Sequence, residues 1–201
     1  MNLQNGDTTL WAVVLGAVLA TFSGFVANQL EASLHRRERE RAAALLFGEI
    51  LSVLDLLTTM AHEARGRGEP YGPFTMRLLR ALRREVDTYD RYRDALYDLR
   101  DPKLRGQIHA LMVRVTVSLD SIAETSAMIG QIESDIRALH AEHPERVDVL
   151  ARLETLLEAR EGSFDFAVEA IGRAPPIITM LRPLAKQDFG VYASIIRDPG
   201  T

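Results

Sequence analysis

Residues 8–30 read TTLWAVVLGAVLATFSGFVANQL, a run of 23 residues without a charged side chain. As a helix this run rises about 1.5 Å per residue and covers roughly 34 Å, enough to cross a hydrocarbon core of about 30 Å. Trp11 lies near its start and Asn28 and Gln29 at its end, where such side chains suit the membrane interface. We therefore predict a transmembrane helix within residues 1–30.

The charges on either side of this run predict its orientation. Before it the sequence has Asp7 and no Lys or Arg, which disfavours a cleaved signal peptide, since such peptides begin with a positive segment. Soon after it come the basic residues Arg36, Arg37, Arg39 and Arg41. Because Lys and Arg beside a span stay in the cytoplasm, we expect a single-pass protein of the cytoplasmic (inner) membrane, with its N-terminus outside and the rest in the cytoplasm. The absence of cysteine agrees with a reducing compartment.

Small residues recur at every fourth position within the predicted span. The row consists of Ala12, Gly16, Ala20 and Gly24, and Asn28 continues it. Small side chains at this spacing let two helix backbones approach closely, which is how transmembrane helices associate in lipid. The row predicts a helix-packing face and a homo-oligomer, although alanine and glycine are also simply frequent in membrane helices.

The next segment, residues 31–64, has no proline and only Gly48 as a weak breaker, so we expect the helix of the span to continue through it. Its apolar residues form a wide stripe, which favours a central helix packed on several sides. Residues 42–60 are apolar enough to suggest a rival topology, in which a second span turns back after the arginines. Glu49 and Asp55 argue against it, because each carboxylate near a bilayer centre costs roughly 2.5 to 3.5 kcal/mol.

Residues 65–201 are expected to form the remainder of a helical bundle. Gly and Pro between 65 and 73 mark a loop, a helix over about 74–99 follows, and Asp101 with Pro102 starts a helix of about 103–141. Further helices are predicted over 147–171 and over 177–184, the latter stopped at Pro183, with a short apolar piece at 191–196. The predicted fold class is all-α: one N-terminal transmembrane helix continuing into an elongated, cytoplasmic, antiparallel helical bundle, with spacing that also allows coiled-coil pairing between chains.

Catalytic signatures are absent from the sequence. Without cysteine there is no thiol nucleophile, and no glutamate is followed by histidine three residues later, as a di-iron bundle requires. His140, Glu142 and His143 form a possible ligand set, but Pro144 beside them makes an exposed turn the better interpretation. We therefore predict a protein that is not an enzyme and has no cofactor and no metal.

One charged surface remains as a candidate partner-binding site. It consists of Arg77, Arg80, Arg83 and Arg84, which crowd the first half of their helix, while aspartates crowd the second half. This order opposes the helix dipole, so the charges do not stabilise an isolated helix. A solvated surface is the plain alternative. The net charge of −4 and the nearby aspartates disfavour nucleic acid, so a cytoplasmic protein is the expected partner.

These observations favour a membrane-anchored helical scaffold or adaptor that self-associates and presents its bundle to protein partners. A subunit of a homo-oligomeric membrane pore or transport assembly is the first alternative, although the span has few polar residues to line water. A signal transducer without intrinsic catalysis is the second alternative.

Overall fold

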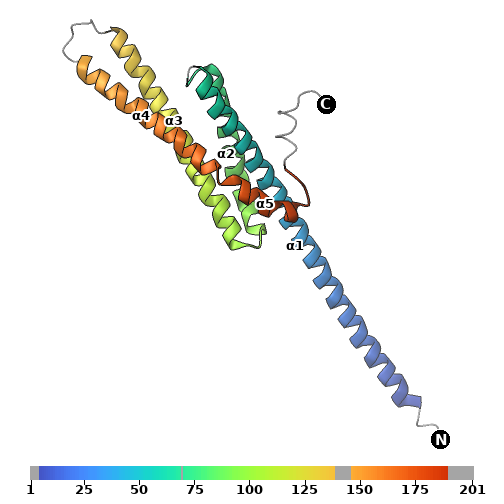
Figure 1. The fold of residues 1–201 in the computed structure, drawn as a ribbon. Coiled ribbons are helices and arrows are strands. Elements are labelled where there is room, and N and C mark those ends of the chain that lie inside the picture. The colour runs from blue at the N-terminus through green and yellow to red at the C-terminus, as the bar shows by residue number, and fades with distance from the viewer. Residues whose placement is uncertain (1–4, 69, 139–145, 190–201) are drawn as a thin grey trace.

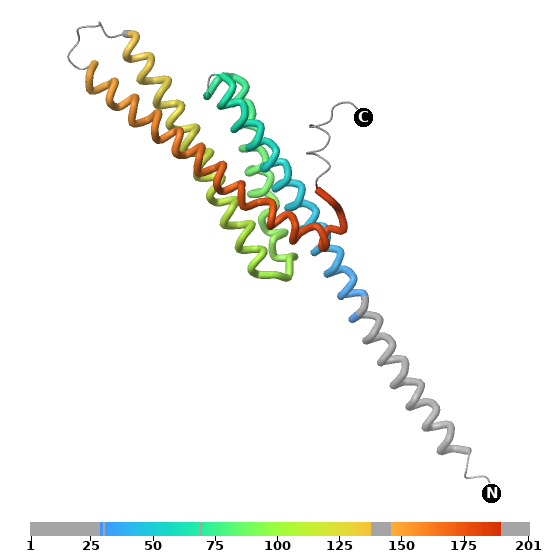
Figure 2. Tube along the Cα trace, in the orientation of Figure 1, coloured from blue at the N-terminus to red at the C-terminus, as the bar shows by residue number. Residues whose placement is uncertain are grey.

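The computed structural model describes residues 5–68, 70–138 and 146–189, with side chains described at 29, 31–68, 70–137 and 146–189. Every element in this part of the chain is helical, and the fold is a long apolar N-terminal helix followed by a helical bundle, which confirms the predicted fold class (Figures 1 and 2). The elements are α1 (Asn5–Arg67), α2 (Pro73–Tyr92), the 3₁₀ helix η1 (Arg93–Asp98), α3 (Pro102–Ala138), α4 (Arg146–Ile171) and α5 (Ala174–Ala185).

Helix α1 is continuous over 63 residues, about 95 Å at the usual rise. From Glu31 to Ala42 its side chains are exposed or half-buried, whereas beyond Ala42 they form the centre of the bundle. The apolar residues of α1 that are buried there are Ala43, Ala44, Phe47, Ile50, Leu51, Leu54 and Ala61. They lie on several sides of the helix because α2, α4 and α5 all pack against it, as the wide apolar stripe predicted.

The same part of α1 resembles a membrane span in composition. Among the residues with described side chains, Glu31–Arg67 is the one helical segment long and apolar enough to cross a membrane, and 44% of its most apolar stretch is buried inside the bundle. In addition, α1 makes no turn after its arginines, as a helical hairpin would require. The structure therefore uses residues 42–60 as a core helix.

Helix α2 packs against α1, and α3 packs against α2 and α4. The sequence predicted the turn between α2 and α3 in part. Pro73 opens α2, and Asp101 caps α3, since its Oδ1 accepts a hydrogen bond from the Lys103 amide at 2.8 Å. The predicted helix over 74–99 was too long, however. It ends as an α-helix at Tyr92 and tightens into η1, which brings the buried Leu96 and Leu99 onto the core.

Helices α4 and α5 complete the bundle, with α4 against α3 and α5 across α1. The prediction that Pro183 stops the last helix is wrong, because α5 continues to Ala185 with Pro183 inside it. Because proline has no N–H, α5 lacks one hydrogen bond, the one that position 183 would otherwise donate to the carbonyl of Thr179. The chain leaves α5 through Lys186, whose φ of 54° is left-handed.

Just after α5, the ring of Phe189 packs on the backbone of α1 at Gly48. Phe189 is only 3% exposed, and a Cβ atom built on Gly48 would lie 2.1 Å from its ring. The ring of Phe189 can therefore come this close to the backbone of α1 only because residue 48 has no side chain. The apolar piece predicted at 191–196 lies outside the described residues.

Candidate functional site

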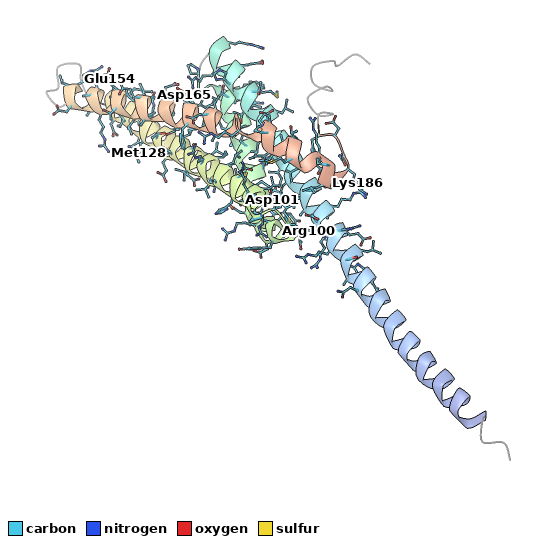
Figure 3. All side chains as sticks on the ribbon, turned by 60° about the horizontal axis from the view of Figure 1, so that its bottom comes forward. Arg100, Asp101, Met128, Glu154, Asp165 and Lys186 are labelled. Atoms are coloured by element: carbon cyan, nitrogen blue, oxygen red, sulfur yellow. The ribbon has the colours of Figure 1, made fainter. Side chains whose placement is uncertain are left out.

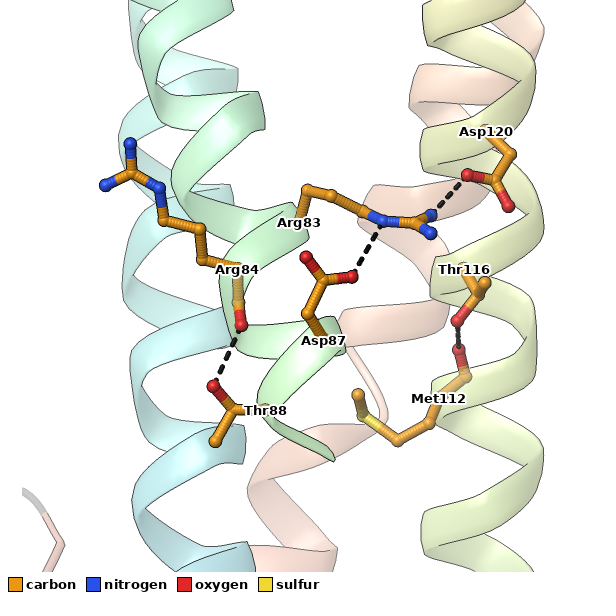
Figure 4. Close-up of polar contacts among 7 residues, drawn as sticks. All are labelled: Arg83, Arg84, Asp87, Thr88, Met112, Thr116 and Asp120. Atoms are coloured by element: carbon orange, nitrogen blue, oxygen red, sulfur yellow. Dashed lines mark hydrogen bonds and ion pairs between the residues drawn. The ribbon is translucent and has the colours of Figure 1, made fainter. Parts of the chain in front are cut away.

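The arginines of α2 divide into two groups in the structure. Arg83 bonds inside the protein: its Nε donates to Asp87 at 3.1 Å and its guanidinium pairs with Asp120 of α3 (Figure 4). Arg84 points away from Arg83 in the same view, and its carbonyl accepts a hydrogen bond from Thr88 at 2.9 Å. Arg83 thus joins two helices, while its neighbour faces solvent.

Arg77, Arg80 and Arg84 are exposed on α2. Arg80 turns its Nε to the carbonyl of Met76, 3.2 Å away, and remains open to solvent otherwise. Of the four arginines predicted to bind a partner, three are therefore exposed and Arg83 is half-buried and paired. Their role in partner binding stays a prediction.

The arginines that follow the apolar run lie on the exposed part of α1. Arg39 approaches Asp98 of η1 at 3.9 Å, and Arg41 donates from Nε to the carbonyl of Ala185 at 3.1 Å. Arg36 lines a groove between α1 and the turn into α3. Beyond their proposed effect on topology, Arg39 and Arg41 therefore connect α1 to η1 and to the end of α5, whereas Arg36 and Arg37 are exposed.

The predicted helix-packing face cannot be placed in the same way. The backbone of α1 is helical there, so positions four apart share one side of it. The side chains of the five residues concerned lie outside the described residues: Ala12, Gly16, Ala20, Gly24 and Asn28.

At the opposite end of the bundle, an aromatic and charged cluster joins α1 to α4. Arg65 donates to Asp165 at 2.8 Å, approaches Glu161 at 3.3 Å and stacks 4.7 Å above the ring of Phe164. Tyr71 meets Phe164 edge-on, with 6.2 Å between ring centroids. Burial, followed by the Glu161 carboxylate, raises the pKa of Tyr71 to about 12. Arg65 of α1, Tyr71 of the turn before α2 and Phe164 of α4 thus form a structural clamp that holds these three segments together.

Beside this clamp, a groove of about 470 Å³ opens between the end of α1 and the start of α2. Met60, Ala64 and the exposed Phe74 give it an apolar wall, and Glu63 and Arg67 lie on its rim. Among the described residues that line this groove, no pair has the geometry of a nucleophile and a base.

In the part of the chain that the structure describes, no three His, Asp or Glu side chains gather around a common point. The set predicted to be an exposed turn, His140, Glu142 and His143, lies outside the described residues.

Neither the clamp around Arg65 nor the groove lined by Arg36 was predicted from the sequence. Arg65 and Asp165 are 100 residues apart, and Arg36 and Arg105 are 69 apart, so no local pattern joins them. No protein-family profile, curated protein or solved structure matches the chain.

Proposed function

We propose that this protein is a membrane-anchored helical scaffold that self-associates through residues 12–28 and presents its bundle to protein partners. The observation that carries the proposal is the continuity of α1, which contains both the apolar run of residues 8–30 and the central helix of the bundle. An anchor of this kind fixes the bundle to the bilayer without a flexible linker. A single pass in the cytoplasmic membrane, with the bundle inside, follows from the arginines after the run.

Surface features of the bundle support a protein partner. Arg77, Arg80 and Arg84 form an exposed basic face on α2. Val113 and Val117 are exposed one turn apart on α3, giving a second, apolar face. Arginine is enriched at protein–protein interfaces, so the basic face on α2 is the feature that supports a protein partner most directly.

The oligomer is tested by native mass spectrometry of the full chain in mild detergent. We expect a defined homo-oligomer that Gly16→Leu with Gly24→Leu converts to a monomer, because leucine prevents close backbone approach. The matched control, Val14→Leu with Val18→Leu, enlarges another side of the same helix and should keep the oligomer. An unchanged mass for the Gly→Leu variant would exclude this face, and a high, ring-like copy number would favour the pore alternative.

The topology is tested with single cysteines, since the natural chain has none. Asn2→Cys places a thiol before the predicted span, and Gly130→Cys places one in α3 of the bundle. A side chain at position 130 has open space around it. On intact spheroplasts, a membrane-impermeant maleimide should label Asn2→Cys, whereas Gly130→Cys should react only after lysis. Labelling of Gly130→Cys before lysis would contradict the proposed orientation.

A further inference from the structure

A polar groove of about 530 Å³ lies at the end of the bundle from which α1 emerges. The turn from η1 into α3 forms one wall and the exposed part of α1 the other; Figure 3 shows Arg100 and Asp101 of this turn close to the point where α1 leaves the bundle. The residues that matter in it are Gln29, Ser33 and Arg36 of α1 and Tyr97, Arg100 and Arg105 opposite.

The acids at this groove are already paired. Arg39 lies 3.9 Å from Asp98, and Arg100 uses both its amide and its Nε on Glu40, each at 3.2 Å. Arg105 donates from one terminal nitrogen to the carbonyl of Leu99 at 3.1 Å, which leaves its other N–H groups available. Arg36 has an exposed side chain with no ion pair among the described residues. The groove therefore offers two arginines to an anion, and a guanidinium suits the oxygens of a phosphate.

The position of the groove along α1 identifies the source of the phosphate. Gln29 is within the end of the apolar run, and Arg36 is six residues beyond Leu30, about 9 Å along the helix. The polar region of one leaflet extends roughly 5 to 8 Å beyond the hydrocarbon. Tyr97 is 79% exposed on the same wall, and a tyrosine ring suits this interface. By contrast, Arg77 and Arg80 lie near the start of α2, at the end of that helix distant from this groove.

We propose that this groove binds the phosphate of an anionic phospholipid headgroup, held by Arg36 and Arg105 with Tyr97 beside it. The proposal rests on the membrane anchor proposed above and assigns a ligand to the base of the bundle. A lipid bound there holds the bundle at a fixed angle to the bilayer, because it contacts α1 and α3 together.

The test is native mass spectrometry of the full chain in detergent, titrated separately with dioleoylphosphatidylglycerol and dioleoylphosphatidylcholine. We expect tighter binding of the phosphatidylglycerol, reduced about tenfold in Arg36→Gln with Arg105→Gln, since each lost charge-assisted hydrogen bond weakens the complex. The control, Arg137→Gln with Arg152→Gln, removes the same charge at exposed positions of α3 and α4 outside the groove and should bind like the wild type. Arg36→Gln alone, at an exposed side chain, should shift binding in the same direction and keeps the test valid if the double variant unfolds.

Equal binding of the two lipids, or an equal loss in the control, would overturn the proposal. Competition by millimolar sodium phosphate would assign the groove to a free anion and overturn the lipid as its occupant. Alkaline carbonate extraction tests the anchor separately. Extraction of the wild-type chain would overturn the anchor and the lipid with it, whereas a chain retained in the membrane without lipid preference would overturn only the groove's assignment.

Discussion

Gly48 lies where the ring of Phe189 packs on α1, so a methyl group added there must displace that ring. We expect Gly48→Ala to lower the free energy of unfolding by up to about 3 kcal/mol, the value of burying a phenylalanine side chain. Gly130→Ala is the control: it has open space in α3 and should gain up to about 1 kcal/mol from helix propensity. Urea unfolding followed by circular dichroism measures both changes.

The same contact is tested by a double-mutant cycle. In a Phe189→Ala background the methyl group of Gly48→Ala meets no ring, so its cost should disappear. Additive effects of the two substitutions would show that Phe189 does not pack on Gly48.

Lys186 holds a left-handed backbone conformation that a residue with a Cβ adopts at a cost of roughly 1 to 2 kcal/mol. Lys186→Gly should therefore raise the melting temperature, although the greater freedom of glycine in the unfolded chain offsets part of the gain. Gln187→Gly, at a position without a positive φ, should only lower it.

Burial of the Tyr71 and Tyr89 side chains should make the stability of the fold depend on pH in the alkaline range. Burial raises the pKa of each to about 12, compared with an ordinary value of 10. As the pH rises from 10 to 12 the unfolded chain loses these protons before the folded protein does, so stability is full below pH 10 and falls across this window. Absorbance at 295 nm should show two late-titrating tyrosines. Tyr71→Phe and Tyr89→Phe should each remove one, and a variant that keeps both would contradict the assignment.

At the scale of the elements, the sequence predicted those features that depend on neighbouring residues. Asp101 and Pro102 start a helix by local capping, and the spacing of apolar residues in 42–60 places a helix in a core. The tightening into η1 was not visible, because it follows from docking Leu96 and Leu99 onto other helices. The clamp at Arg65 was missed for the same reason, since its partners come from α4.

The two groups of arginines on α2 are expected to behave differently. Arg80→Glu with Arg84→Glu should reduce the capture of a protein partner and leave helicity and melting temperature unchanged, because both side chains are exposed. A double-mutant cycle on Arg83 and Asp120 should give a coupling of only about 0.2 to 1 kcal/mol, as for other solvent-exposed ion pairs. A large fall in melting temperature for the Arg80 and Arg84 variant would make those charges structural.

For the whole molecule, α1 fixes the rotation of the bundle relative to the predicted span. One alanine inserted between Ser33 and Leu34 turns everything after it by about 100°. The proposed packing face lies wholly before this point, and Arg36, Tyr97 and Arg105 all lie after it, so the oligomeric mass and the binding of phosphatidylglycerol should both stay the same. A changed mass in native mass spectrometry would show that the bundles take part in the interface.

The packing of α5 across α1 also sets an order of events during synthesis. Residues 42–60 of α1 leave the ribosome more than 110 residues before α5, which at about 5 to 20 residues per second is a delay of roughly 6 to 23 s. Throughout that interval a segment with the composition of a membrane span waits without one of its native neighbours. A higher translation rate shortens this interval, and with it the time during which the apolar surface of residues 42–60 lacks α5.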